Sequence, residues 1–148
     1  MAAARDGWSD LDADLGEIDG IAVILDTVGF ADGAIAVHLR ARRNMRRDEL
    51  DAGFQAALGG WEQVASAARD RGERPPDPPP QPGALLNAIA LRLHDDAGTS
   101  YRWLGSQAAG SGTEWDAIRR FGPQPPAEAT RLTLTRGGAA GRGYALAF

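Results

Sequence analysis

Two stretches near the N-terminus have the apolar pattern of β-strands. Residues 18–30 are rich in Ile and Val, carry Gly near both ends and are too short for a typical helix, which predicts a strand. Residues 34–42 alternate apolar and polar positions, as a strand with one buried face does. Because the turn sequence Ala-Asp-Gly lies between them at 31–33, we expect the two strands to form a hairpin.

The apolar period then changes to that of an amphipathic helix over residues 47–72. Apolar residues recur there every three or four positions, with Phe54, Leu58 and Trp61 at the centre of the stripe. Asp48 is suited to cap the first turn of this helix. The pattern therefore predicts one long helix after the first hairpin.

A proline tract, RPPDPPPQPG at residues 74–83, follows the predicted helix. Proline restricts φ and lacks a backbone N–H, so the tract predicts an extended polyproline II connector. Two interpretations stay open. A connector that carries the chain back to the sheet needs no partner, whereas the same tract can bind an aromatic-lined partner domain.

Period-2 patterns return in the C-terminal half. The predicted strands there are 87–94, 99–104, 115–121, 130–136 and 142–148. A turn sequence at 95–98 predicts that the first two of these pair with each other. With the first hairpin the total is about seven strands, which favours a mainly β, antiparallel β-sandwich with an inserted helix. We predict one domain over 18–148 and a loose acidic N-terminal arm over 1–17.

The C-terminal strands contain a succession of three short motifs. The run LRLHDDAGTSY at 91–101 has the hairpin form L-x-L-x-D-x-x-G-x-x-Y, and FGP at 121–123 and LTL at 132–134 follow it as an edge strand and a further strand. This succession resembles immunoglobulin-like sandwich domains of uncharacterised bacterial, actinobacterial-like proteins. The resemblance implies an immunoglobulin-like sandwich that serves as a binding or assembly module without a catalytic site. The helix and the proline tract depart from that pattern.

Composition narrows the class of protein further. The chain has 148 residues, of which 43% are hydrophobic and 24% charged, as expected of a folded domain. It has no cysteine, which excludes disulfides, thiolate metal sites and a thiol nucleophile. The net charge of −4 argues against a general nucleic-acid binder. The first 20 residues are acidic and residues 40–47 are basic; we favour a solvated basic segment, and pairing between the two segments is the alternative. Without a secretory signal or a membrane-spanning stretch, we expect a cytoplasmic protein with no membrane partner.

The two histidines are the main candidates for site chemistry. His38 and His94 both fall on the polar faces of their strands. If those strands are neighbours, the imidazoles converge with Asp95 and Asp96 as a polar cluster that can hold a metal. The simpler interpretation, which we favour, is two solvent-facing imidazoles and an ordinary Asp turn, with no metal and no cofactor.

These patterns favour a non-catalytic protein-interaction or assembly module. We expect no enzyme, because the sequence has no nucleophile elbow and no phosphate-binding loop. The expected partner is another protein or a second copy of the chain, bound through an edge strand or through the helix face at Phe54, Leu58 and Trp61. The alternative is a small-ligand or metal-binding protein, or an enzyme, with a dispersed site around the two histidines.

Overall fold

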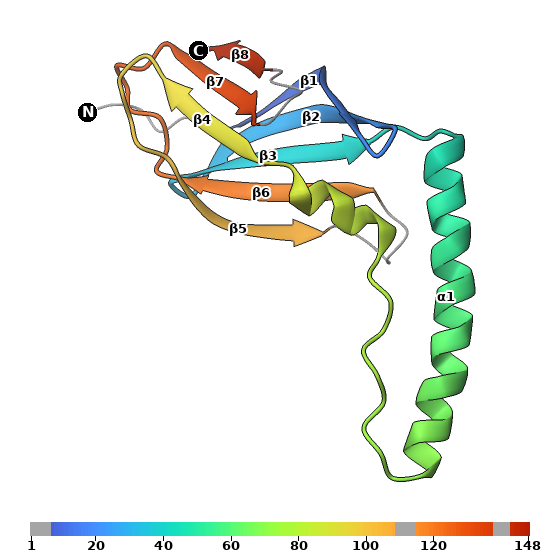
Figure 1. Cartoon of the computed structure of the whole chain (residues 1–148). Helices are drawn as coiled ribbons and strands as arrows, with labels where there is room; N and C mark the ends of the chain where they lie inside the picture. Colours follow the sequence, from blue (N-terminus) through green and yellow to red (C-terminus); the bar gives the residue numbers. More distant parts are fainter. Residues whose placement is uncertain (1–6, 109–114, 138–142) are drawn as a thin grey trace.

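The hydrophobic segments form eight strands, one long α-helix and one short 3₁₀-helix in the part of the chain that the computed structural model describes, residues 7–108, 115–137 and 143–148. The elements are β1 (Gly7–Ile18), β2 (Ile21–Ala31), β3 (Ala34–Ala41), α1 (Met45–Asp70), η1 (Pro82–Ala88), β4 (Leu91–Asp95), β5 (Arg102–Ala108), β6 (Asp116–Gly122), β7 (Arg131–Arg136) and β8 (Gly143–Ala147). The prediction of a mainly β fold with one inserted helix is confirmed (Figure 1).

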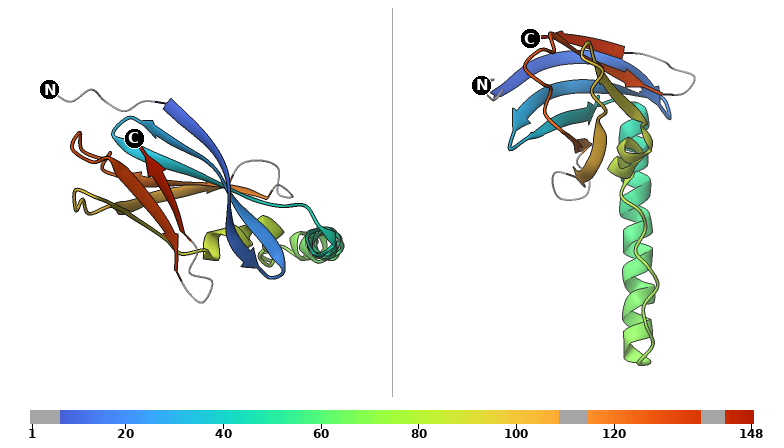
Figure 2. Two further views of the ribbon diagram at one scale, coloured as in Figure 1. Left: turned by 90° about the horizontal axis from the view of Figure 1, so that it is seen from above. Right: turned by 90° about the vertical axis from the view of Figure 1, so that its left-hand side faces the viewer.

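The strands form two antiparallel sheets in a sandwich-like arrangement (Figure 2). One sheet has the order β1-β2-β3-β6-β5 and the other the order β4-β7-β8. The core between them takes Val23, Leu25 and Val37 from the larger sheet and Leu132 and Leu134 from the smaller one. On one side the sandwich is closed, because Arg136 at the end of β7 donates to the carbonyl oxygen of Leu15 in β1, 3.1 Å away. On the opposite side β4 and β5 diverge (Figure 1).

The predicted loose arm at 1–17 is wrong over its described part, because residues 7–18 form β1 and pair with β2. Residues 1–6 lie outside the described residues. The register of β1 shifts twice, near Asp12 and Gly16, and both residues have positive φ. Each shift inserts a residue and breaks the two-residue period of the strand, so its apolar and polar positions do not alternate regularly. The strand predicted from residue 18 begins later, at Ile21, because Asp19-Gly20 forms the turn between β1 and β2.

The predicted pairing of 87–94 with 99–104 is also wrong. Leu91–Asp95, as β4, pairs with β7, and Arg102–Ala108, as β5, pairs with β6. The segment between them therefore crosses from one sheet to the other instead of closing a hairpin. Residues 87 and 88 belong to η1, which begins at Pro82, a residue whose fixed φ suits the first turn of a helix. The hairpin turn at 31–33 is confirmed, with positive φ at Asp32 and Gly33.

The inserted helix leaves the sandwich instead of covering it. Figures 1 and 2 show α1 extending well beyond both sheets, with the proline connector running back beside it. At 1.5 Å per residue, its 26 residues span about 39 Å. We call α1 together with residues 71–81 the projection. No helix in the described part of the chain combines the length and apolarity that a membrane crossing needs.

The projection is fastened to the sandwich at two points, which we call its feet. The first foot is fastened by Trp115, which lies just before β6 and is 1% exposed. Its indole Nε1 donates to Asp51 Oδ1 in the second turn of α1 at 2.9 Å. The guanidinium of Arg47 lies over the Trp115 ring, 5.6 Å from its centroid, and also donates to the carbonyl oxygen of Ala41 at 2.8 Å. The start of the helix is thus held against β3 and β6 by one indole and one guanidinium.

The second foot is fastened by Arg119 of β6, which is 5% exposed. Its guanidinium donates to the carbonyl oxygens of Leu86 and Ile89 at the end of η1. Burial lowers the pKa of Arg119, because desolvation disfavours the charged form. Since η1 directly follows the connector, this buried cation fixes the point at which the projection returns to the sandwich.

We expect Arg119→Met to lower the free energy of unfolding by about 2–4 kcal/mol, because it removes the guanidinium donor to the Ile89 carbonyl oxygen and leaves Leu86 O with only the long 3.4 Å bond from the Ile89 N–H. The matched control is Arg120→Met on the same strand, where the side chain is exposed and the change should stay within about 0.5 kcal/mol. Urea denaturation followed by tryptophan fluorescence measures both. Equal effects of the two variants would contradict the assigned role of Arg119.

Candidate functional site

The projection begins at Asn44, which caps α1 and ties it to the first hairpin of the large sheet. The Asn44 side chain accepts from the backbone N–H of Arg47 at 2.9 Å and donates to the carbonyl oxygen of Gly20 at 3.0 Å. The predicted cap at Asp48 is therefore wrong by one turn. The helix ends at Asp70, and Gly72 follows with φ of 71°, a left-handed conformation that reverses the chain.

The apolar stripe of α1 contacts the chain's own proline connector. Phe54, Leu58 and Trp61 are half-buried, and Ala65 and Ala68 further along the stripe are buried. Trp61 Nε1 donates to the carbonyl oxygen of Pro76 at 2.8 Å. A polyproline II segment makes no internal hydrogen bonds, so its carbonyl oxygens are free to accept from the helix. The stripe thus has an occupant within the chain, and its role as a face for a partner stays a prediction.

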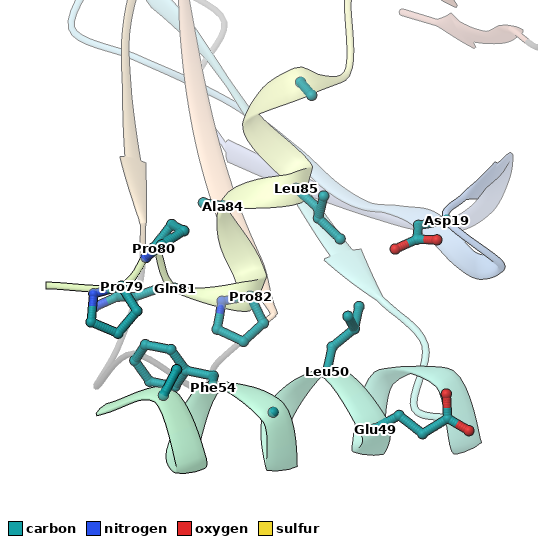
Figure 3. Close-up of a pocket in the computed structure, with 13 residues that line it drawn as sticks. Asp19, Glu49, Leu50, Phe54, Pro79, Pro80, Gln81, Pro82, Ala84 and Leu85 are labelled. Atoms are coloured by element: carbon teal, nitrogen blue, oxygen red, sulfur yellow. The ribbon is translucent and has the colours of Figure 1, made fainter. Parts of the chain in front are cut away.

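An apolar hollow lies where the projection meets the sandwich, and we call it the base cleft. Its volume is about 530 Å³, within the range of small-molecule sites. Its walls are Leu50 and Phe54 of α1, Leu85 of η1, and the rings of Pro79, Pro80 and Pro82 (Figure 3). Figure 3 shows the helix side chains pointing toward the proline rings and toward η1. The two feet of the projection hold these walls apart.

One end of the base cleft is charged. Asp19 and Glu49 line it, and Arg46 joins them, with its Nη2 3.0 Å from Asp19 and its Nη1 3.4 Å from Glu49. The hydrogen bond that Arg46 donates to Asp19 raises the pKa of Arg46. Asp19 is placed there by the tight Asp19-Gly20 turn, in which both residues have positive φ. Arg46–Asp19 and Arg40–Asp12, the latter at 2.6 Å, show that the acidic and basic segments pair, which was the alternative to a solvated basic segment.

The structure does not bring the two histidines together. His38 lies on β3 of the large sheet, and His94 on β4 of the small sheet. His38 Nδ1 is 3.4 Å from Asp26 and its Nε2 is 3.1 Å from Asp116, so its two ring nitrogens face different carboxylates. His94 Nε2 lies 3.5 Å from Thr135 Oγ1. The proposed cluster of His38, His94, Asp95 and Asp96 is therefore not assembled.

Asp95 and Asp96 instead hold the segment that crosses between the sheets. Asp95 accepts from the backbone N–H of Thr99 at 3.0 Å and from the Tyr101 hydroxyl at 2.6 Å. Partial burial would raise the pKa of Asp95, but the hydrogen bonds from Thr99 and Tyr101 together outweigh it and lower the pKa to about 2. Asp96 accepts from the hydroxyl and the N–H of Thr130, which lowers its pKa as well. Both carboxylates are structural.

The base cleft is a candidate binding site. Among residues 7–108, 115–137 and 143–148, no group of three His, Cys, Asp or Glu side chains could hold a metal ion. The base cleft is apolar along its walls and carries charge only at one end, as sites for apolar side chains or small molecules do. Sequence reasoning placed Asp19 and Arg46 only within the acidic and basic segments, without linking them to a site, and it missed Arg119; the Asp-Gly turn signal at 19–20 could have located Asp19.

Trp61→Ala should loosen the distal half of the projection without unfolding the sandwich. It removes both the indole packing and the donor to Pro76, so we expect faster amide exchange over residues 58–72 and unchanged protection in β2 and β3. Hydrogen exchange with mass spectrometry measures both regions. Val64→Ala, an exposed position on the same helix, is the control and should leave exchange unchanged. Equal loss of protection in β2 and β3 would mean that the projection and the sandwich unfold together.

Acid should weaken the fold partly through Asp95. Its pKa of about 2 in the folded state lies below the ordinary aspartate value of 3.8, so its stabilising effect is present above about pH 4 and is lost as pH falls through 2. Asp95→Asn should therefore lower the free energy of unfolding by roughly 1 kcal/mol at pH 7, and the difference from the unaltered chain should shrink toward pH 2. Urea melts at several pH values test this. Asp77→Asn, in the exposed connector, is the control; a constant difference for Asp95→Asn across the pH range would refute the assignment.

Comparison with known proteins supplies no family for this arrangement. No protein-family model, no curated protein and no solved structure matches the chain. The resemblance to immunoglobulin-like domains therefore stays a prediction. What the chain does has to be argued from the projection, the base cleft and the edges of its sheets.

Proposed function

We propose that the protein is a non-catalytic interaction or assembly module whose projection is the element presented to a partner protein. The observation that carries this proposal is the shape of the insertion: α1 extends beyond both sheets and is fastened at its base through Asp51 and Arg47 (Figure 1). The central core takes none of its buried residues from α1.

The cost of ordering supports this proposal. Each ordered residue costs roughly 1–2 kcal/mol of backbone entropy, and the distal projection recovers little of that from the core. Its own stripe and the connector keep it folded, through Ala65, Ala68 and the Trp61–Pro76 hydrogen bond. A segment that is kept ordered by its own contacts, and that leaves most of its surface exposed, is suited to presenting a rigid face to a partner.

The alternative, a small-ligand or metal site around the two histidines, has less support. His38 and His94 lie in different sheets, and Asp95, the residue after His94, is engaged by the backbone N–H of Thr99 in a turn. If a small molecule does bind, the apolar base cleft is the better place for it.

The proposal predicts that the projection contacts a partner in the cells the protein comes from. A photoreactive phenylalanine analogue at Val64, 54% exposed on α1, should give a discrete cross-linked product. The same analogue at Asp32, in the exposed hairpin turn of the sandwich, is the control. The product at position 64 should weaken when Trp61→Ala is added. Cross-links at position 32 alone, or products at position 64 that do not depend on Trp61, would refute a role for the folded projection.

A further inference from the structure

A separate surface is the outer edge of β5, at the end of the large sheet. In the described part of the chain, β5 pairs with β6 on one side only. Its Trp103 is 64% exposed and its Leu104 60% exposed, and both belong to the few large apolar side chains left in solvent. An edge strand with free backbone groups and exposed apolar side chains readily pairs with another strand.

The other sheet edges carry features that oppose pairing. β1 has two register shifts and exposed carboxylates at Asp12, Asp14 and Glu17. β4 has five residues, with Arg92 and His94 exposed. β8 ends beside the large sheet, where Phe148 packs edge-on against Phe30 with ring centroids 5.5 Å apart. The edge of β5 has neither carboxylate nor proline, and its one irregularity, at Leu104, leaves that leucine projecting.

We propose that β5 pairs with β5 of a second copy, in antiparallel orientation, so that the two large sheets join into one. The two-fold axis then passes through Gly105, the middle residue of Arg102–Ala108. This register places residue 103 of one copy opposite residue 107 of the other, and residue 104 opposite residue 106. Cyclic two-fold pairing is the commonest symmetry of protein dimers.

The chemistry of β5 fits a second copy of itself. At the proposed axis Gly105 has no side chain to keep two strands apart, and no heavy atom lies within 4 Å of where its Cβ would be, so a substituted side chain also fits there. Arg102 is the one charged residue of the strand and lies at its end, so the two arginines of a dimer are about 20 Å apart and screened from each other. Trp103 also borders two hollows of about 370 and 230 Å³, shared with Leu91 and Phe121, on the open side of the sandwich.

The size of this contact predicts a weak dimer. A seven-residue edge spans about 23 Å. With Trp103 and Leu104 from each copy, the buried surface falls near or below the roughly 1,200 Å² at the small end of stable interfaces. We therefore expect a dissociation constant on the order of 10 μM, with Trp103 as the residue that contributes most.

The absence of cysteine from the chain gives a direct test of the register. Gly105→Cys places two thiols opposite each other across the axis, where paired strands hold Cα atoms about 4.5–5.5 Å apart, within disulfide reach. Mild oxidation should give a disulfide dimer. Arg102→Cys is the matched control on the same strand, because its two copies lie about 20 Å apart and should not cross-link. Cross-linking of both variants alike, or of neither, would overturn the proposed pairing.

Sedimentation equilibrium of the full chain from about 1 to 200 μM tests the dimer without a cross-link. The unaltered protein should shift from monomer to dimer over this range. Trp103→Ala with Leu104→Asp should be monomeric throughout, with circular dichroism to confirm that it is folded. Val64→Asp, which changes an exposed apolar residue of the projection, should dimerise normally. The proposal is overturned if the unaltered protein is a monomer at every concentration, or if Val64→Asp abolishes the dimer and the β5 variant does not. Neither result bears on the proposed role of the projection, which the cross-linking experiment tests separately.

Discussion

The buried guanidinium of Arg119 is the interaction on which the unusual part of this fold depends. A charged group that is 5% exposed destabilises a protein unless polar atoms of the chain replace its water, and here the carbonyl oxygens of Leu86 and Ile89 do so. These carbonyls lie at the C-terminal end of η1, where unpaired carbonyl oxygens favour a cation. Because η1 cannot move off β6 without leaving that charge unpaired, the end of the connector is fixed, and with it the return path of the projection.

The helix and the proline connector stabilise each other in a way that neither achieves alone. An isolated helix with two adjacent glycines, Gly59 and Gly60, is marginal in water, and a polyproline segment has no hydrogen bonds of its own. Packing the stripe of α1 on the connector buries Ala65 and Ala68 and gives the Trp61 indole an acceptor in Pro76. The two feet, at Trp115 and Arg119, keep the pair together at the base, and the base cleft is the space they leave between them.

Local sequence patterns predicted the local structure, but they did not predict which strands pair over long distances in the sequence. The hairpin turn at 31–33, the helix and the mainly β class follow from period and turn chemistry, which neighbouring residues determine. β1 was missed because its register shifts at Asp12 and Gly16 break the regular alternation of apolar and polar residues that identifies a strand. Strand order determines the three features that were not predicted. These are the crossing of 95–101 between the sheets, the separation of His38 from His94, and the contact of Arg119 with η1. A period-2 pattern says which face of a strand is buried and nothing about which strand lies beside it.

β6 is the strand to which both proposed contact surfaces, the projection and the β5 edge, are attached. Arg119 of β6 binds η1, and Trp115, just before β6, binds α1. β6 also pairs with β5, where Ser106 lies opposite Arg119 and Gly105 opposite Arg120. The projection and the β5 edge are therefore fixed to one strand in adjacent registers. If β5 joins two copies, each dimer presents two projections in a fixed relation, and a partner with two binding sites gains affinity by effective concentration without any new contact. The rigidity that Arg119 gives to β6 and η1 would then serve the geometry of an assembly as well as the stability of one chain.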